Sequence, residues 1–258
     1  MPLVDVGDAR LHVEVDGEGE PVTVLGHGLT NTCRELARIT PVLPGTKVRF
    51  CFRGHGHSTS PKTGYRFADF ARDFDAVATE YGATRAAGTS LGAGAIMSLL
   101  VHTPDRFERL VFLLPAGLDR PFEHKENMIR TAELLETKPR DEAIDAILTD
   151  PGRLATYLRQ PWMRDFDREA WDHADMHALA SAIREVIEDY PVPDRELLRR
   201  VEAPTMLICR EGDEIHPAEI GHVLAEIMPN AELWNYPDDI ALFDALPEIV
   251  QRVIELLR

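Results

Sequence analysis

The segment GTSLG at residues 88–92 combines residue types and a spacing that suggest nucleophilic chemistry. It fits the pattern G-x-S-x-G, with a short strand-like run before it and a small-residue, helix-like run after it. A serine at such a turn has a strained backbone that needs flanking glycines, and its hydroxyl lies near a helix N-terminus that favours negative charge. Ser90 is therefore a candidate nucleophile, and the alternative interpretation is an ordinary glycine-rich turn.

The elements that must position this serine follow an alternating pattern. Short apolar runs bounded by glycine and proline predict strands buried in a parallel sheet, at residues 22–25, 48–52, 85–89, 110–114, 205–209 and 232–236. Alternating polar and apolar residues at 3–6 and 11–15 predict a β-hairpin before these strands. Helix-like segments lie between the strands, at 34–39, 67–81, 91–102, 218–227 and 241–257. This alternation predicts a wound α/β sheet.

The segment from Asp119 to about Arg200 has a different pattern. Its apolar residues recur at helical spacing over some eighty positions, and no convincing strand interrupts them. We therefore expect a helical insertion between two parts of an α/β core.

Composition narrows the classes of protein and of partner. The 258 residues include 44% hydrophobic side chains, enough for a large core, and 44 acidic against 28 basic side chains give a formal charge of −16. Such a charge repels nucleic acid and anionic membranes, and no apolar stretch approaches the roughly 20 residues that span a bilayer. Three scattered cysteines and an N-terminus without a signal-peptide pattern favour a cytoplasmic protein.

Three motifs together resemble the α/β-hydrolase superfamily, in its lipase- and esterase-like form with a helical cap. HGL at 27–29 resembles the oxyanion loop, RGHGHS at 53–58 resembles the loop after the fourth strand, and residues 88–116 resemble the nucleophile elbow, its helix and the sixth strand. The resemblance covers nearly the whole chain. It implies an α/β-hydrolase fold, a mostly parallel eight-stranded sheet flanked by helices, with a cap between strands 6 and 7. The core would comprise residues 1–117 and 201–258, and the cap residues 118–200.

The resemblance also implies roles for individual residues. Ser90 would be the nucleophile, and Asp213, four residues before Pro217, would be the acid that orients a histidine. The backbone N–H groups of Leu29 and Leu91 would form the oxyanion hole.

The catalytic histidine is missing from its usual place, where this sequence has Ile240. No histidine follows His222, and a serine without a base is a weak nucleophile. The preferred replacement is His216, which lies close to Asp213 in the sequence. Other histidines that could enter the pocket are His27, His55, His57, His173 and His177.

The predicted cap supplies apolar surface for a substrate. Trp162 and Phe166 favour an organic molecule larger than acetate, although such residues are equally ordinary in a helical lid. His27 and Ile240 are also expected to contact the substrate. We expect no metal site, because the His173 and His177 pair has no recognisable third ligand, and no cofactor, because no nucleotide-binding motif is present.

These features predict an enzyme that acts on a carbonyl or ester group of a small to medium, largely apolar molecule through Ser90 and an oxyanion hole, with a non-standard or missing base. Two alternatives stay open: a lyase- or cyclase-type enzyme using the same pocket, and a non-catalytic protein that binds a small ligand. A small molecule is the expected partner, without nucleic acid or membrane, and a homodimer is left open.

Overall fold

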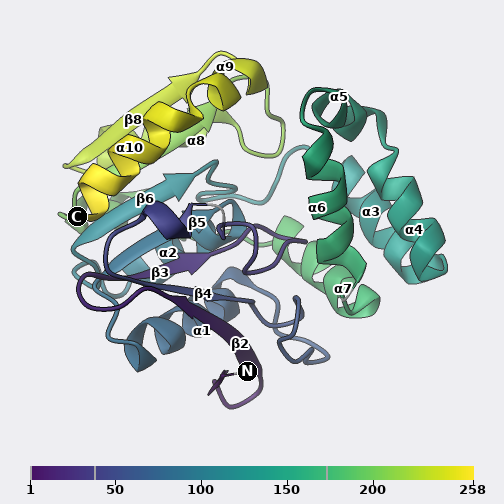
Figure 1. Cartoon of the computed structure of the whole chain (residues 1–258), viewed down its shortest axis with the longest axis horizontal. Helices are drawn as coiled ribbons and strands as arrows, with labels where there is room; N and C mark the ends of the chain where they lie inside the picture. Colours follow the sequence, from purple (N-terminus) through teal and green to yellow (C-terminus); the bar gives the residue numbers. More distant parts are fainter. Residues whose placement is uncertain (1, 38, 173) are drawn as a thin grey trace.

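The computed structural model describes residues 2–37, 39–172 and 174–258 (Figure 1). Its centre is an eight-stranded sheet in the order β1-β2-β4-β3-β5-β6-β7-β8. The strands are β1 Leu3–Asp5, β2 Arg10–Asp16, β3 Val22–Gly26, β4 Thr46–Phe50, β5 Arg85–Thr89, β6 Arg109–Leu113, β7 Thr205–Arg210 and β8 Ala231–Tyr236. β2 pairs antiparallel with β1 and β4, and the other pairs are parallel. The predicted mostly parallel eight-stranded sheet is confirmed.

Helices cover both faces of the sheet because successive strand residues point to opposite sides. Val24 faces one apolar cluster, which includes side chains from α1 (Phe67–Glu80), α2 (Leu91–Leu100) and α8 (Ala218–Ile227). Leu25 faces another cluster, with side chains from α9 (Asp239–Asp244) and α10 (Leu246–Leu257). Burial on both faces explains why the central strands are continuous apolar runs in the sequence.

Five α-helices and a short 3-10 helix, Arg195–Arg200, lie between β6 and β7 in the described part of this segment, and no strand interrupts them there. The α-helices are α3 Glu126–Thr137, α4 Arg140–Leu148, α5 Pro151–Arg159, α6 Pro161–Asp172 and α7 Met176–Ile187. These helices share an apolar cluster of their own, centred on residues such as Trp171 and Ile183. Figure 1 shows them as a group beside the sheet, in teal and green. We call this segment the helical insertion.

Two predicted helices differ from the structure. The helix predicted at 34–39 is not formed in its described part: residues 33–37 form consecutive turns, in which the N–H of Glu35 bonds to the carbonyl of Thr32. The predicted closing helix at 241–257 is split into α9 and α10. Pro247 explains the split, because it lacks the N–H that would continue the first helix and is well suited to begin the second.

No helix among the described residues has both the length and the apolar character needed to cross a membrane.

Candidate functional site

Ser90 lies in the sharp turn between β5 and α2, as the G-x-S-x-G pattern predicts. Its φ of +50° and ψ of −106° are unusual for a residue with a side chain, and its N–H donates a 3.0 Å hydrogen bond to the carbonyl of Leu113. A Cβ added at Gly88 would lie 2.4 Å from the backbone of Gly92, and one at Gly92 would lie 2.3 Å from the carbonyl oxygen of Gly26. Both flanking glycines are therefore required by close backbone packing.

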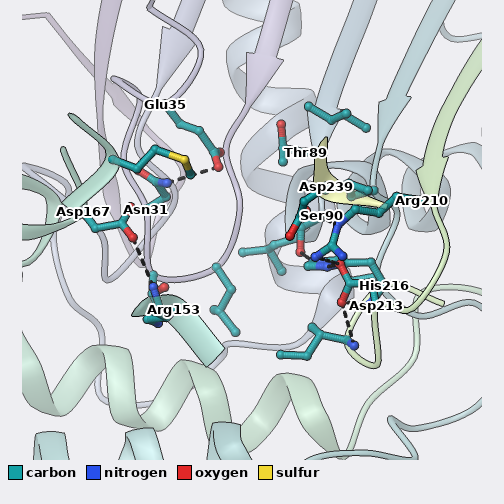
Figure 2. Close-up of a pocket in the computed structure, with 18 of the residues that line it drawn as sticks. Asn31, Glu35, Thr89, Ser90, Arg153, Asp167, Arg210, Asp213, His216 and Asp239 are labelled. Atoms are coloured by element: carbon teal, nitrogen blue, oxygen red, sulfur yellow. Dashed lines mark hydrogen bonds and ion pairs between the residues drawn. The ribbon is translucent and has the colours of Figure 1, made fainter. Parts of the chain in front are cut away.

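His216 lies between Ser90 and Asp213 (Figure 2). Its Nε2 is 2.9 Å from the Ser90 Oγ, and its Nδ1 is 2.8 Å from the Asp213 Oδ2. The imidazole thus contacts the serine through one ring nitrogen and the aspartate through the other, which is the geometry of a Ser-His-Asp triad. Both the acid and the histidine come from the loop that follows β7.

Asp213 is held in its ionised form. Burial alone would raise its pKa, but the hydrogen bond from His216 and the charges of His216 and Arg210 outweigh burial and hold the pKa well below its usual range. Its Oδ1 also accepts hydrogen bonds from the N–H groups of Ile215 and His216, at 3.0 and 3.1 Å. Because an ionised carboxylate only accepts hydrogen bonds, Nδ1 of His216 carries the proton and donates it to Asp213 in a hydrogen bond. Nε2 is then unprotonated and can accept the hydroxyl proton of Ser90.

Two residues that were expected to contact the substrate do not line the cavity described below. Ile240 has a 43% exposed side chain on α9, whereas its neighbours Asp239 and Leu242 do line the cavity. His27 is 1% exposed, and both of its ring nitrogens make hydrogen bonds to backbone, to the Gly28 carbonyl at 2.7 Å and to the Phe52 N–H at 3.0 Å. Both residues were expected at the pocket because of their positions in the sequence. Sequence position alone does not show in which direction a side chain points.

The other candidate bases in the described residues lie elsewhere. His55 is buried, its Nδ1 is 2.8 Å from the carbonyl of Arg53, and burial lowers its pKa to about 4. The ring of His57 packs edge-on against His12, and His177 is exposed on α7. His173 lies outside the described residues. Of these candidates, His216 is the histidine that the described structure brings to Ser90.

The predicted donors Leu29 and Leu91 both line the cavity that contains Ser90. The carbonyl of Gly28 accepts hydrogen bonds from His27 Nδ1, at 2.7 Å, and from the Asn31 N–H, at 3.1 Å. These bonds fix the peptide between Gly28 and Leu29, so the Leu29 N–H points away from that carbonyl. Leu91 is the first residue of α2, where an N–H has no partner within the helix.

The cavity has a volume of about 910 Å³ and is lined from both parts of the molecule. All five helices of the helical insertion contribute to it, including Trp162, Met163 and Phe166 of α6, and the core contributes the loops around Ser90 together with α9 and α10. Trp162 and Phe166, which were expected to contact the substrate, therefore both line the cavity. Trp171, the other tryptophan of α6, is 2% exposed and packs within the apolar cluster of the helical insertion.

Sequence reasoning missed several polar groups of this cavity. Figure 2 shows Glu35, Asn31, Asp167 and Arg153 on one side, across from Ser90 and its neighbours on the other. Arg210 could have been found from its position at the end of a predicted strand, three residues before Asp213. Glu35 gave no signal, because its placement depends on the turns at 33–37 that replace the predicted helix.

One group of potential metal ligands lies apart from the residues that line the cavity. His12, Glu14 and Cys33 have ligand atoms within 4.8 Å of one another. The guanidinium of Arg49 lies 2.9 Å from the carboxylate of Glu14 and would oppose a cation there.

Comparison with known proteins places the chain in a family. The sequence profile described as alpha/beta hydrolase fold matches residues 50–239, which is more than half of the chain. A Synechocystis sp. protein with the provisional name of non-heme chloroperoxidase is 25% identical, covering 93% of this chain and 97% of the relative.

Two solved structures show the same fold. The enol-lactonase from Burkholderia xenovorans LB400 has a TM-score of 0.82 and 22% identity, covering 99% of both chains. An esterase from Exiguobacterium antarcticum has a TM-score of 0.78 and 17% identity, covering 99% of this chain and 98% of the esterase. The profile match and the shared architecture lead to one conclusion: this chain belongs to the α/β-hydrolase fold family.

Proposed function

We propose that this protein is a serine hydrolase that cleaves carboxylic esters of small to medium, largely apolar molecules. The observation that carries the proposal is the pair of contacts of His216, with Ser90 at 2.9 Å and Asp213 at 2.8 Å. A histidine within hydrogen-bond reach of both groups can supply the base that Ile240 does not. Similarity to an esterase and a lactonase supports an ester as the substrate class.

The reaction follows from the positions of these groups. The Oγ of Ser90 attacks the ester carbonyl while Nε2 of His216 takes the hydroxyl proton, and ionised Asp213 stabilises the resulting imidazolium. The N–H groups of Leu29 and Leu91 donate to the oxyanion of the tetrahedral intermediate. His216 returns the proton to the leaving alcohol, and water then repeats these steps on the acyl-enzyme to release the acid.

The helical insertion would act as the cap of this site. Its helices supply much of the cavity wall, and apolar side chains such as Met163 and Phe166 face the space in front of Ser90. Such a lid removes water from the reacting groups and provides apolar contacts for the acyl chain.

Hydrolysis of p-nitrophenyl butanoate tests this proposal. Ser90→Ala should abolish turnover above background, and Ser98→Ala, a serine change on the same helix, should leave it unchanged. Unchanged hydrolysis by Ser90→Ala would contradict the proposed nucleophile. A wild-type protein that hydrolyses neither this ester nor simple lactones would favour non-hydrolytic chemistry or ligand binding in the same cavity.

A further inference from the structure

Glu35 lies in the wall of the cavity beside the loop that would bind the oxyanion. Its Oε2 accepts the N–H of Gly28 at 2.7 Å, and its Oε1 accepts the side-chain amide of Asn31 at 3.1 Å. A Cβ added at Gly28 would lie 3.5 Å from a carboxylate oxygen of Glu35 and 3.6 Å from the Cβ of Ser90. Only the thickness of the Gly28 backbone therefore separates Glu35 from the nucleophile.

The carboxylate of Glu35 has capacity for a further donor. A carboxylate accepts about four hydrogen bonds, and Gly28 and Asn31 supply two to Glu35. Because Glu35 lines the cavity, a bound molecule can reach the remaining positions. Figure 2 shows Glu35 among the side chains that line the pocket, across from Ser90.

No cation among the described residues is paired with Glu35, although the cavity contains three arginines. Each arginine has an acidic partner: Arg130 with Asp150 at 3.5 Å, Arg153 with Asp167 at 3.2 Å, and Arg210 with Asp213 at 2.9 Å and with Asp239 at 2.8 Å. Among the acids of the cavity wall, this leaves Glu35 and the exposed Glu214 without a positive partner in the described chain.

This distribution of charge should favour cationic over anionic substrates. An anionic group placed near Glu35 would be repelled in a wall that is partly shielded from water, and a cationic group would gain the attraction that Glu35 lacks from the protein. The formal charge of −16 also favours the approach of cations over anions.

We propose that Glu35 is a specificity-determining residue, which binds a positively charged substituent on the acyl part of the substrate. The preferred substrate is then an ester of a cationic acid, such as an ammonium-substituted alkanoate. The apolar wall holds the alkyl chain, and Glu35 holds the charged end. This inference rests on the proposed function, because it takes the cavity around Ser90 as the substrate site.

The charge preference should depend on pH. Burial and the charge of Asp167 raise the pKa of Glu35 to about 7, although the hydrogen bonds from Gly28 and Asn31 lower it in part. The titratable groups that face it from neighbouring elements are Asp167 of α6, with its partners Arg153 and Tyr157 of α5, and His216 across the cavity. Above about pH 7, Glu35 is mostly ionised and binds a cation, and below that value it is mostly neutral.

Three p-nitrophenyl esters of similar size test the inference. They are the 4-(trimethylammonio)butanoate, whose charge is independent of pH, the isosteric neutral 5,5-dimethylhexanoate and the anionic monoester of glutarate. For wild-type protein near pH 8, kcat/KM for the cationic ester should exceed that for the neutral one by roughly tenfold, and the anionic ester should be the poorest. The ratio should approach one near pH 6.

Two variants locate the effect. Glu35→Gln keeps the size and the acceptor for Gly28 but removes the charge, and it should remove the preference for the cationic ester at pH 8. Glu214→Gln removes a charge from the exposed part of the same wall, and it should change the ratio by less than about twofold because water screens that site. Equal ratios in wild type and Glu35→Gln would overturn the inference.

Binding to Ser90→Ala separates this inference from the proposed function. Calorimetric titration with the methyl esters of the same cationic and neutral acids should show tighter binding of the cation, which Glu35→Gln in the same background removes. That result would support the inference even if no ester is hydrolysed, in which case the proposed function fails alone. If the cationic and neutral esters are hydrolysed and bound equally well, the inference is overturned and the esterase proposal stays in place.

Discussion

Asp213 and His216 are three residues apart in one loop, so a single turn of the chain holds both the proposed acid and the proposed base. The i to i+3 spacing lets Nδ1 of the histidine meet a carboxylate that its own backbone N–H also contacts. This local arrangement explains how the site has a histidine at Ser90 although Ile240 occupies the usual position.

Removing the charge of Asp213 should reduce catalysis without removing the serine. Asp213→Asn can donate to His216 Nδ1 and so favour the tautomer with the proton on Nε2, which cannot accept the proton of Ser90. We expect kcat for p-nitrophenyl butanoate to fall on the order of 10²- to 10⁴-fold, with a smaller change in KM. Glu211→Gln, at an exposed position of the same loop outside the cavity wall, is the control and should retain activity. A kcat near that of wild type in Asp213→Asn would show that Asp213 does not orient the base.

The sequence predicted the residues of this site unequally. Ser90 follows from a local pattern, because the turn between a strand and a helix is encoded by its own glycines. His216 could be proposed as the preferred replacement because it is close to Asp213 in the sequence, but other histidines stayed open, since loop conformation decides which of them reaches the nucleophile. Glu35 could not be found, because it faces the cavity only when the preceding residues form turns.

Helices and strands whose buried residues follow a regular repeat could be predicted from the sequence. The central strands and α1, α2 and α8 appear close to the expected positions, because their apolar residues repeat with the period of the element. The split between α9 and α10 depends on one proline, and the turns at 33–37 depend on hydrogen bonds to a neighbouring loop. Such features depend on tertiary contacts that periodicity does not report.

The close contact between α2 and β3 gives a prediction about stability. Gly92→Ala would place a methyl group 2.3 Å from the carbonyl oxygen of Gly26, and neither backbone can move without disturbing the sheet. We expect the free energy of unfolding in urea to fall by about 1–3 kcal/mol. Ser98→Ala, later in the same helix, should change it by less than about 0.5 kcal/mol. Equal stability of Gly92→Ala and wild type would show that this packing is looser than described.

A buried ion pair joins the loop after β4 to α1. Arg53 and Asp73 both have fully buried side chains, and the guanidinium contacts the Asp73 carboxylate at 2.7 and 2.9 Å. Arg53→Met leaves the carboxylate without its partner, and we expect a loss of about 3–5 kcal/mol in the free energy of unfolding. Asp8, which also contacts Arg53, is half exposed, so Asp8→Asn should cost less than about 1 kcal/mol. A similar loss in both variants, measured by urea unfolding, would contradict this difference.

The proposed catalytic groups and much of the cavity wall come from different parts of the chain. The core supplies Ser90, Asp213 and His216, and the helical insertion supplies much of the apolar surface opposite them. Sequence analysis could separate the two parts by their periodicity. It could not give the volume or charge of the space between them, which depends on how the helices pack.

The size of the cavity predicts a dependence on acyl chain length. Each methylene that enters an apolar site contributes about 0.8 kcal/mol, so kcat/KM for neutral p-nitrophenyl esters should rise about three- to fourfold per methylene from acetate to hexanoate. Met163→Trp should shorten the preferred acyl chain, because the larger side chain fills part of the cavity. Leu158→Trp, at an exposed position of α5, is the control and should keep the wild-type profile. A flat profile would indicate that the acyl group does not enter the apolar cavity.

The proposed mechanism depends on activation of Ser90 by His216. The most direct measurement is the second-order rate constant of labelling by a fluorophosphonate, followed by intact mass, for wild type, Ser90→Ala, His216→Ala and His216→Ala with Ile240→His. We expect one label on wild type, none on Ser90→Ala, and labelling of His216→Ala slower by at least about 100-fold. The double variant should stay slow, because position 240 is exposed and outside the cavity wall. Labelling of His216→Ala at the wild-type rate would show that His216 does not activate Ser90.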